Sequence, residues 1–421
     1  MKNDKTCIIV GAGMLGLCSA LEFLKRGYQV TLVDQDEPGL GATFGNAGFI
    51  ATELVDPLST WSTIKSAPAL LMRRHGALAV PAANLGNSLP WMTRFALAAR
   101  PAQVAHARSA LAWINRQAVP AWQRILADEN LAGHLVASHY LRVWENASGQ
   151  AAAAQEAEFY QKWGIEARLI GKEETASVEP ALRETINHAV VLPHAHRLQD
   201  PYWLAQALFA AFRQRGGNFI KHAVSRIRAE NGQVRVSAGQ DILAGQALVC
   251  AGAYSARLLR QFGVSIPLMA ERGYHLHLPE TRDLLQGPIC SADRNVFISQ
   301  LDSGLRIVGF SELGGVDLPP QPARFDSLRH HLGGILPQTR TALPAADEWM
   351  GRRPTLPDSL PVIDTHPHHP NIGFAFGHQH MGITLAAISA QLISQKMSAG
   401  TSPKELSPYA VTRFKMAGSF S

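Results

Sequence analysis

Apolar and polar positions at the start of the chain follow the order strand, turn, helix, strand. Residues 7–10 are apolar throughout, which predicts a strand buried on both faces of a parallel sheet. Apolar residues then recur at helical spacing over 17–26, and Gly27 is suited to end that helix. A β-branched run over 29–33 follows directly and predicts a second strand. The pattern therefore predicts a βαβ unit at the start of the chain.

Similar patterns recur far along the chain and predict a mixed α/β protein. Asp200 followed by Pro201 is suited to begin a helix, because aspartate caps free N–H groups and proline fits the first helical position. The amphipathic run after it predicts a helix over 202–212, and an apolar run predicts another over 383–393. Residues 247–250 read as a further buried parallel strand. Other runs predict an antiparallel sheet with strands over 273–278, 296–300 and 305–310.

The glycines between the first strand and the first helix are spaced for binding a dinucleotide. Gly11, Gly13 and Gly16 form a G-x-G-x-x-G pattern, which allows a tight turn, close approach of a pyrophosphate and close packing of helix on strand. The helix N-terminus offers N–H groups and the positive end of its dipole to phosphates. Asp34, at the end of the second strand, is placed to accept hydrogen bonds from a ribose hydroxyl. The alternative, a glycine-rich turn without a ligand, does not explain why all these features occur in register.

The stretch after Asp34 favours a flavin dinucleotide over a nicotinamide one. Residues 38–48 show no repeating strand–helix pattern, but carry several glycines and end in Gly-Asn-Ala-Gly. Small residues leave room for a large planar ligand to lie against the backbone. A flexible surface loop is the alternative, and the apolar pair Phe49-Ile50 that follows argues against it.

Several segments, taken together, resemble a known family. They are residues 11–50, Gln199-Asp200-Pro201, Leu248 to Ser255, Glu271-Arg272-Gly273-Tyr274, Trp349 to Asp358 and Phe376 to Thr384. In order and sequence they are similar to motifs of bacterial D-amino-acid dehydrogenases, within the superfamily of D-amino-acid oxidase-like flavoproteins. The similarity spans nearly the whole chain and is more specific for the superfamily than for a substrate. One departure is Gln379, where the family commonly has glycine.

The resemblance implies an α/β fold in which a Rossmann-like FAD-binding domain is combined with a substrate domain that contains an antiparallel sheet. We expect the FAD-binding domain over residues 1–56, 150–264 and 348–421, and the substrate domain over 57–149 and 265–347. FAD is expected to bind non-covalently, because covalent relatives attach it through cysteine or histidine at set positions and no cysteine follows Cys290. The residues expected to contact FAD are Gly11, Ala12, Gly13, Met14, Leu15, Gly16, Asp34, Gln35, Gly41, Ala42, Thr43, Asn46, Ala47, Gly48, Ile50, Val224, Ala251, Gly252, Gly351, Gly377, His378, Gln379, His380, Met381, Gly382, Ile383 and Thr384.

Three residues are candidates for the chemistry. Amine oxidation by a flavin moves a hydride from the substrate Cα to flavin N5, so the protein mainly orients the substrate and holds its amine neutral. The resemblance assigns the substrate carboxylate to Arg353, whose guanidinium fork suits both oxygens. It places Tyr274 near the substrate, with a core tyrosine whose hydroxyl is satisfied as the alternative. His380, if it lies beside a flavin, can donate a hydrogen bond to a flavin carbonyl or shift the pKa of the substrate amine. No metal ligands are expected.

The resemblance implies oxidative deamination of a D-amino acid, as in amino-acid catabolism, with hydrolysis of the imine product. D-proline or a hydroxy-D-proline is the nearest variant of the substrate. Two other classes stay open, namely a flavin hydroxy-acid oxidase and an FAD-binding subunit of a larger dehydrogenase. The resemblance also predicts a quinone-like electron acceptor in preference to oxygen.

Composition narrows the expected partners and compartment. The chain has 421 residues and a formal net charge of +6, but its basic residues are scattered, which argues against nucleic acid as a partner. Its four cysteines form no C-x-x-C pair and suit a reducing cytoplasm. Over residues 61–101 tryptophans and arginines interleave, either within a helical part of the substrate domain or as a face for a membrane surface. We therefore expect a cytoplasmic protein, with peripheral contact at the inner face of the cytoplasmic membrane as the alternative.

Overall fold

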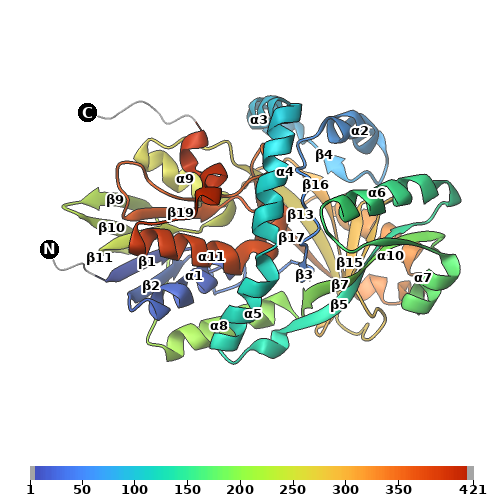
Figure 1. Ribbon diagram of the computed structural model, residues 1–421, viewed down its shortest axis with the longest axis horizontal. Helices are drawn as coiled ribbons and strands as arrows, with labels where there is room; N and C mark the ends of the chain where they lie inside the picture. The colour runs from blue at the N-terminus through green and yellow to red at the C-terminus, as the bar shows by residue number, and fades with distance from the viewer. Residues whose placement is uncertain (1–4, 415–421) are drawn as a thin grey trace.

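The computed structural model describes residues 5–414, which form two large sheets with helices around them (Figure 1). The first sheet has the strand order β18-β19-β12-β1-β2-β8, and its neighbours are parallel except for β18 and β19. Segments from the start, middle and end of the chain therefore share one sheet. Its strands are β1 (Thr6–Val10), β2 (Gln29–Asp34), β8 (Asn218–Lys221), β12 (Gln246–Val249), β18 (Val362–Thr365) and β19 (Ile372–Phe376).

The second sheet has ten strands and is mainly antiparallel. Its order is β17-β13-β16-β15-β14-β5-β7-β3, with β4 paired to β16 and β6 paired to β7. These strands are β3 (Phe49–Ile50), β4 (Leu78–Ala79), β5 (Leu135–Trp144), β6 (Arg168–Gly171), β7 (His188–Leu198), β13 (Met269–Leu278), β14 (Ile289–Ser291), β15 (Val296–Leu301), β16 (Gly304–Glu312) and β17 (Asp347–Thr355). A small antiparallel sheet consists of β9 (Arg226–Glu230), β10 (Gln233–Ala238) and β11 (Gln240–Ala244).

Helices and the small sheet cover both faces of the six-stranded sheet. Cys7 and Ile9 of β1 pack in one apolar core with α1, α4, α5, α8 and α11, while Ile8 and Val10 pack on the other side with β9 and β10. Every residue of the apolar run is thus buried, as the sequence predicts for a central parallel strand. The helices are α1 (Met14–Lys25), α2 (Trp61–Met72), α3 (Leu85–Ala98), α4 (Pro101–Asn115), α5 (Ala118–Asp128), α6 (Gln150–Lys162), α7 (Lys172–Val178), α8 (Pro201–Gln214), α9 (Ser255–Leu259), α10 (Pro322–Ile335) and α11 (Gly382–Ala399).

The predicted elements are present in the structure. β1, α1 and β2 form the βαβ unit, and β13, β15 and β16 form part of an antiparallel sheet. Asp200 caps α8, because its Oδ1 accepts hydrogen bonds from the N–H groups of Tyr202 (2.7 Å) and Trp203 (3.1 Å). The predicted fold class, a Rossmann-like domain joined to an antiparallel sheet, is confirmed. No helix within residues 5–414 is both long and apolar enough to cross a membrane.

The two large sheets divide the chain differently from the predicted domain boundaries. β6 and β7 lie within residues 150–264, and β3 lies within 1–56, yet all three belong to the ten-stranded sheet. β17, which covers the start of 348–421, also belongs to it. The sequence pattern does not reveal this, because the apolar run of β7 shows a strand but not its partner β5. We propose that the domain division follow the sheets.

Candidate active site

The turn after β1 has the shape that the glycine pattern predicts. Gly11 has φ +113°, a conformation that residues with a side chain rarely adopt, and a Cβ there would overlap the carbonyl of Cys250. A Cβ on Gly16 would overlap the carbonyl of Gly11, so α1 packs directly on the end of β1. The first turn of α1, residues 14–17, is uncharged, which leaves its positive end free for an anion.

Two side chains border this turn. Asp34 Oδ2 accepts a hydrogen bond from the N–H of Ala12 at 2.6 Å, and Thr43 Oγ1 accepts one from the N–H of Met14 at 3.0 Å. Burial, the largest influence, raises the pKa of Asp34 above its usual value although these backbone donors act in the opposite direction. A hydroxyl at the helix start and a carboxylate beside the turn are donors and acceptors that a pyrophosphate and a ribose require.

The other residues that we predicted to bind the cofactor lie mainly at one edge of the six-stranded sheet. The carboxyl ends of parallel strands meet at one edge, and there Ala251 and Gly252 follow β12, Gly377 follows β19, and Val224 follows β8. The remaining ones lie beside Asp34 (Gln35), in α1 (Leu15), in the segment from the turn after β2 to β3 (Gly41, Ala42, Asn46, Ala47, Gly48, Ile50), in β17 (Gly351), and in the segment that begins α11 (His378, Gln379, His380, Met381, Gly382, Ile383, Thr384).

Two contacts join these segments. The N–H of Ala51 donates to Thr384 Oγ1 at 2.9 Å, which fixes the end of β3 against the start of α11. The N–H of Gly39 donates to the carbonyl of Ala12 at 2.9 Å, which holds the loop after β2 against the glycine turn. A Cβ on Gly41 would meet nothing within 4 Å, so this loop has open space beside it. The glycine turn, the loop after β2 and the start of α11 together suit a dinucleotide that carries a planar group, as FAD does.

A buried carboxylate forms the centre of the neighbouring part of the site. Glu271 lies on β13, and its Oε1 accepts hydrogen bonds from His380 Nε2 at 2.9 Å, Arg353 Nη1 at 3.3 Å and Ser311 Oγ at 2.6 Å. Its Oε2 accepts one from Thr355 Oγ1 at 2.8 Å. We call these five residues the Glu271 cluster. It joins three strands of the ten-stranded sheet to the short helix η9 (Gln379–Met381) at the start of α11.

The charges of the Glu271 cluster are balanced locally. Burial alone raises the pKa of Glu271, but the neighbouring His380 and Arg353 outweigh it and hold that pKa well below its usual range. Glu271 is therefore ionised at neutral pH. A buried carboxylate without such partners would be strongly unfavourable, so the cluster depends on the hydrogen bonds that His380 and Arg353 donate.

Arg353 lies flat against the sheet with part of its guanidinium accessible. It faces Glu271 across the β13–β17 pair, and its Nη1 also donates to the carbonyl of Phe310 at 2.8 Å. A Cβ on Gly273 would overlap the guanidinium, so glycine at that position is what allows the arginine to lie there. The side chain of Arg353 is 22% exposed, which leaves donors for a ligand carboxylate.

The structure does not bring Tyr274 to this cluster. Successive residues of a strand point to opposite faces, so Tyr274 lies on the face opposite Gly273 and Arg353. Its side chain is buried in the core beneath α10, and its hydroxyl lies 3.3 Å from both carboxylate oxygens of Glu312 and accepts from the N–H of Gln321. This placement does not support the predicted catalytic role of Tyr274, which stays a prediction. The alternative, a core tyrosine, describes its placement.

Gln379 stands where the family commonly has glycine. It has φ +50°, which explains why glycine suits this position. Its side-chain Nε2 donates to the carbonyl of Leu356 at 2.9 Å, which stabilises the strained backbone. The neighbouring His378 is buried, so its pKa falls to about 3, and its Nε2 lies 2.9 Å from Ser389 Oγ. Of the two histidines beside Gln379, only His380 reaches the Glu271 cluster.

Sequence analysis gave no role to four residues that the structure places in or beside the site, namely Glu271, Ser311, Thr355 and Trp349. Glu271 was quoted within the Glu271-Arg272-Gly273-Tyr274 motif, and the signal available was a charged residue inside a strand that is buried throughout. Trp349 was quoted within a motif but given no role. Its ring stacks on His275 with centroids 5.1 Å apart and occupies the space that side chains at Gly45 and Gly351 would take. It therefore holds the loop after β2 against the ten-stranded sheet.

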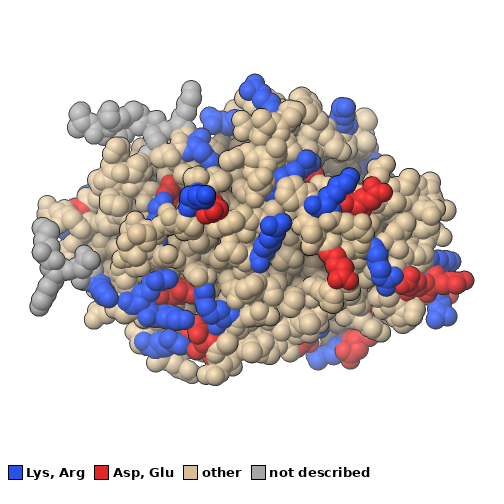
Figure 2. Space-filling view, viewed as in Figure 1, with Lys and Arg blue, Asp and Glu red and all other residues tan. Residues whose placement is uncertain are grey.

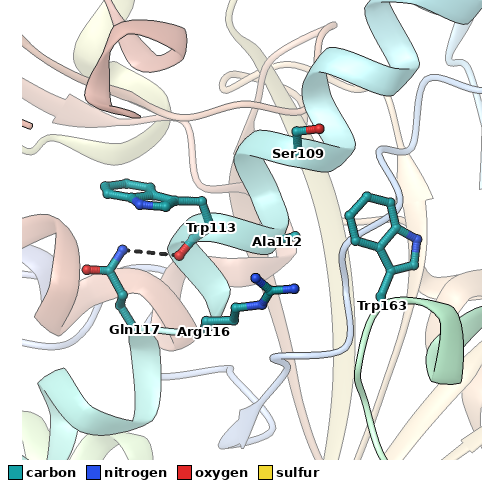
Figure 3. Close-up of a pocket in the computed structure, with 6 residues that line it drawn as sticks. All are labelled: Ser109, Ala112, Trp113, Arg116, Gln117 and Trp163. Atoms are coloured by element: carbon teal, nitrogen blue, oxygen red, sulfur yellow. Dashed lines mark hydrogen bonds between the residues drawn. The ribbon is translucent and has the colours of Figure 1, made fainter. Parts of the chain in front are cut away.

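A surface hollow of about 460 Å³ lies elsewhere, on α4 (Figure 3). Trp113 and Arg116 of α4 line it together with Gln117 and Trp163, and Gln117 Nε2 donates to the carbonyl of Trp113. It shares no residue with the Glu271 cluster or the glycine turn, so we assign it no part in the site. Within residues 5–414 no three histidine, cysteine or acidic side chains gather as a metal site would require.

The fold and the site define a class of enzyme. Residues 6–396 match the DAO family of FAD-dependent oxidoreductases, and the chain belongs to this family. Its cofactor is therefore FAD, for which the glycine turn, Asp34 and the start of α11 are suitably arranged.

Several proteins of known name are similar to this chain in sequence or structure. The chain is 29% identical over 421 residues to a D-amino-acid oxidase of Bradyrhizobium diazoefficiens, covering 98% of this chain and all of the relative. It is 27% identical over 407 residues to a D-amino acid dehydrogenase of Chromohalobacter salexigens, covering 93% and 95% of the two chains. Among solved structures, glycine oxidase from Geobacillus kaustophilus superimposes with a TM-score of 0.74 at 20% identity, over 97% of this chain and 98% of that one.

Proposed function

We propose that this protein oxidises the Cα–N bond of a D-amino acid. The observation that supports this best is the accessible edge of Arg353 beside the Glu271 cluster. Arg353 suits the substrate carboxylate, and the neighbouring Glu271–His380 pair suits an amine that must lose a proton. The two curated relatives, whose names specify D-amino acids, support the same substrate class. FAD, when bound, accepts the hydride from Cα, and the imine product is then hydrolysed in water.

A substrate panel tests this proposal. Purified holoenzyme should reduce a dye with D-amino acids and not with their L-enantiomers. D-proline and hydroxy-D-proline belong in the panel as the nearest variants, and 2-hydroxy acids represent the competing class of hydroxy-acid oxidase. Turnover of hydroxy acids alone would overturn the proposal. A chain that carries FAD but turns over none of these compounds would instead fit an FAD-binding subunit of a larger dehydrogenase.

We propose that the electron acceptor is quinone-like. The supporting observation is a surface formed by α2 and α3, which we call the α2–α3 face. Within residues 5–414, eleven large hydrophobic side chains are more than a third exposed, and seven of these lie between 61 and 97. They are Trp61, Leu71, Met72, Leu85, Leu89, Met92 and Leu97.

The α2–α3 face is also basic. Residues 57–127 contain eight lysines and arginines and no aspartate or glutamate. Figure 2 shows basic side chains and no acidic ones along the upper edge of the molecule, where Figure 1 places α2 and α3. Exposed apolar side chains among cations suit the surface of an anionic membrane. On its buried side, α3 reaches the Glu271 cluster, because Trp91 donates from Nε1 to the carbonyl of Thr355 at 3.3 Å.

Reoxidation of the reduced flavin tests the acceptor. We expect a short-chain quinone to reoxidise the substrate-reduced holoenzyme faster than oxygen does at air saturation. Stopped-flow absorbance of the flavin measures both rates in the same preparation. Faster reoxidation by oxygen would show that the protein is an oxidase.

Vesicle sedimentation tests the membrane contact. We expect the protein to sediment with vesicles containing phosphatidylglycerol, and much less with phosphatidylcholine alone or in high salt, because the attraction is partly electrostatic. Leu89→Ser removes a 57% exposed side chain of α3, and we expect about ten-fold weaker binding, since burying a leucine contributes roughly 1.5–3 kcal/mol. Leu243→Ser removes a leucine of β11 that is 49% exposed and is the matched control. Equal loss in both variants, or no preference for anionic lipid, would contradict the proposal.

A further inference from the structure

The Glu271–His380 contact determines which imidazole nitrogen carries hydrogen. An ionised carboxylate only accepts hydrogen bonds, so His380 Nε2, 2.9 Å from Glu271 Oε1, must be the donor. In the neutral ring the lone pair then lies on Nδ1. Ser311 and Thr355 also donate to Glu271 and thereby fix its orientation. The geometry thus selects one tautomer of His380.

His380 stays accessible while it makes this contact. The side chain of Glu271 is 3% exposed, whereas that of His380 is 36% exposed. Glu271 therefore cannot meet a ligand itself, but the two side chains that it orients can. Arg353 and His380 share the same carboxylate oxygen, so a ligand carboxylate on Arg353 places the adjacent part of that ligand near the imidazole.

We propose that Glu271 is a positioning residue that holds His380 as the acceptor of the substrate's ammonium proton. This inference rests on the proposed function, because only an amine substrate brings such a proton. One N–H bond of the ammonium breaks, the proton passes to His380 Nδ1, and the electron pair stays on the substrate nitrogen. The imidazolium so formed is stabilised by Glu271, which keeps its own charge. The amine is then neutral, as hydride loss from Cα requires.

The polar groups around the Glu271–His380 pair come from two strands, β16 and β17. Arg353 of β17 and His380 of η9 both contact Glu271, while Ser311 of β16 and Thr355 of β17 contribute neutral hydroxyls. Removing the charge of Glu271 leaves Arg353 as the charged neighbour.

Glu271→Gln tests the proposal in the holoenzyme. We expect kcat with the best D-amino acid to fall about a hundred-fold, the lower end of what a positioned base contributes. We also expect KM to change far less than kcat, because Arg353, the proposed anchor of the substrate carboxylate, stays in place. Glu179→Gln is the matched control, because Glu179 is also buried but contacts only the N–H groups of Gln286 and Gly287 and the ring of His139. A Glu271→Gln enzyme with near-normal kcat would overturn the proposal.

A second measurement uses the unmutated protein and needs no turnover. ¹⁵N NMR of histidine-labelled holoenzyme, assigned with a His380→Gln variant, should show His380 as the Nε2–H tautomer at the pH of activity. The Nδ1–H tautomer, or an equal mixture, would overturn the proposal even if Glu271→Gln failed to fold. If no D-amino acid is oxidised, the proposed function fails, whereas a wrong tautomer in an active enzyme contradicts only the role of Glu271.

Discussion

Arg353→Met should abolish most activity on D-amino acids while FAD remains bound. A hydrogen bond to a charged group contributes roughly 1.5–3 kcal/mol, and the guanidinium fork can supply two to a carboxylate. We therefore expect kcat/KM to fall at least about a hundred-fold. Arg353→Lys keeps the charge but not the fork, so its loss should be about ten- to a hundred-fold. Steady-state kinetics and the flavin absorbance of each purified variant measure the two effects separately.

Arg352→Met is the matched control for this prediction. Arg352 is the neighbour of Arg353 on β17, but points to the opposite face, where its Nε donates to the carbonyl of Val316 at 2.8 Å. Its loss should leave kcat/KM within a few-fold of normal. If Arg353→Met retains near-normal efficiency while Arg352→Met loses it, the substrate anchor is Arg352. Amines without a carboxylate, if they are oxidised, should be affected far less by Arg353→Met.

Gly11→Val should remove FAD from the purified protein and lower its stability. Valine at φ +113° is strained, which costs on the order of 1–3 kcal/mol, and its Cβ would overlap the carbonyl of Cys250. The turn must then move away from β12, and the pyrophosphate loses its site. Flavin released on denaturation, relative to protein, measures the cofactor, and thermal unfolding measures the stability.

Gly133→Ala is the control for a glycine that has no such constraint. A Cβ at Gly133 meets nothing within 4 Å, and the residue lies in a short helix away from the cofactor edge. This variant should keep its full complement of FAD. A Gly11→Val protein that retains FAD in equal amount would contradict the assignment of the glycine turn.

The βαβ unit and its cofactor edge were predictable because their signals are local. The glycines, the helix and Asp34 all lie within 34 residues, and each has a conformational reason that the sequence shows directly. The Glu271 cluster was not predictable in the same way. Its central pair, Glu271 and Arg353, is 82 residues apart and meets through the register of β13 with β17, which no pattern in either strand specifies.

A family motif alone does not show which face of its strand Tyr274 occupies. The motif placed it near the substrate, but strand alternation gives Gly273 and Tyr274 opposite faces, and only the pairing with β17 shows which of them faces Arg353. Gln379 is the opposite case, since the motif correctly marks an unusual position. Its positive φ and its bond to Leu356 follow from the three-dimensional loop, not from the residue type.

The order of strands in the six-stranded sheet has a consequence for synthesis on the ribosome. β1 pairs with β12, whose last residue is Val249, and β12 pairs in turn with β19, which ends at Phe376. The ribosome adds about 5–20 residues per second, so β12 and β19 are synthesised on the order of tens of seconds after β1. During that interval an apolar strand edge is exposed to other nascent chains. We expect slow translation or scarce chaperones to reduce the yield of this protein through aggregation, even where its finished form is stable.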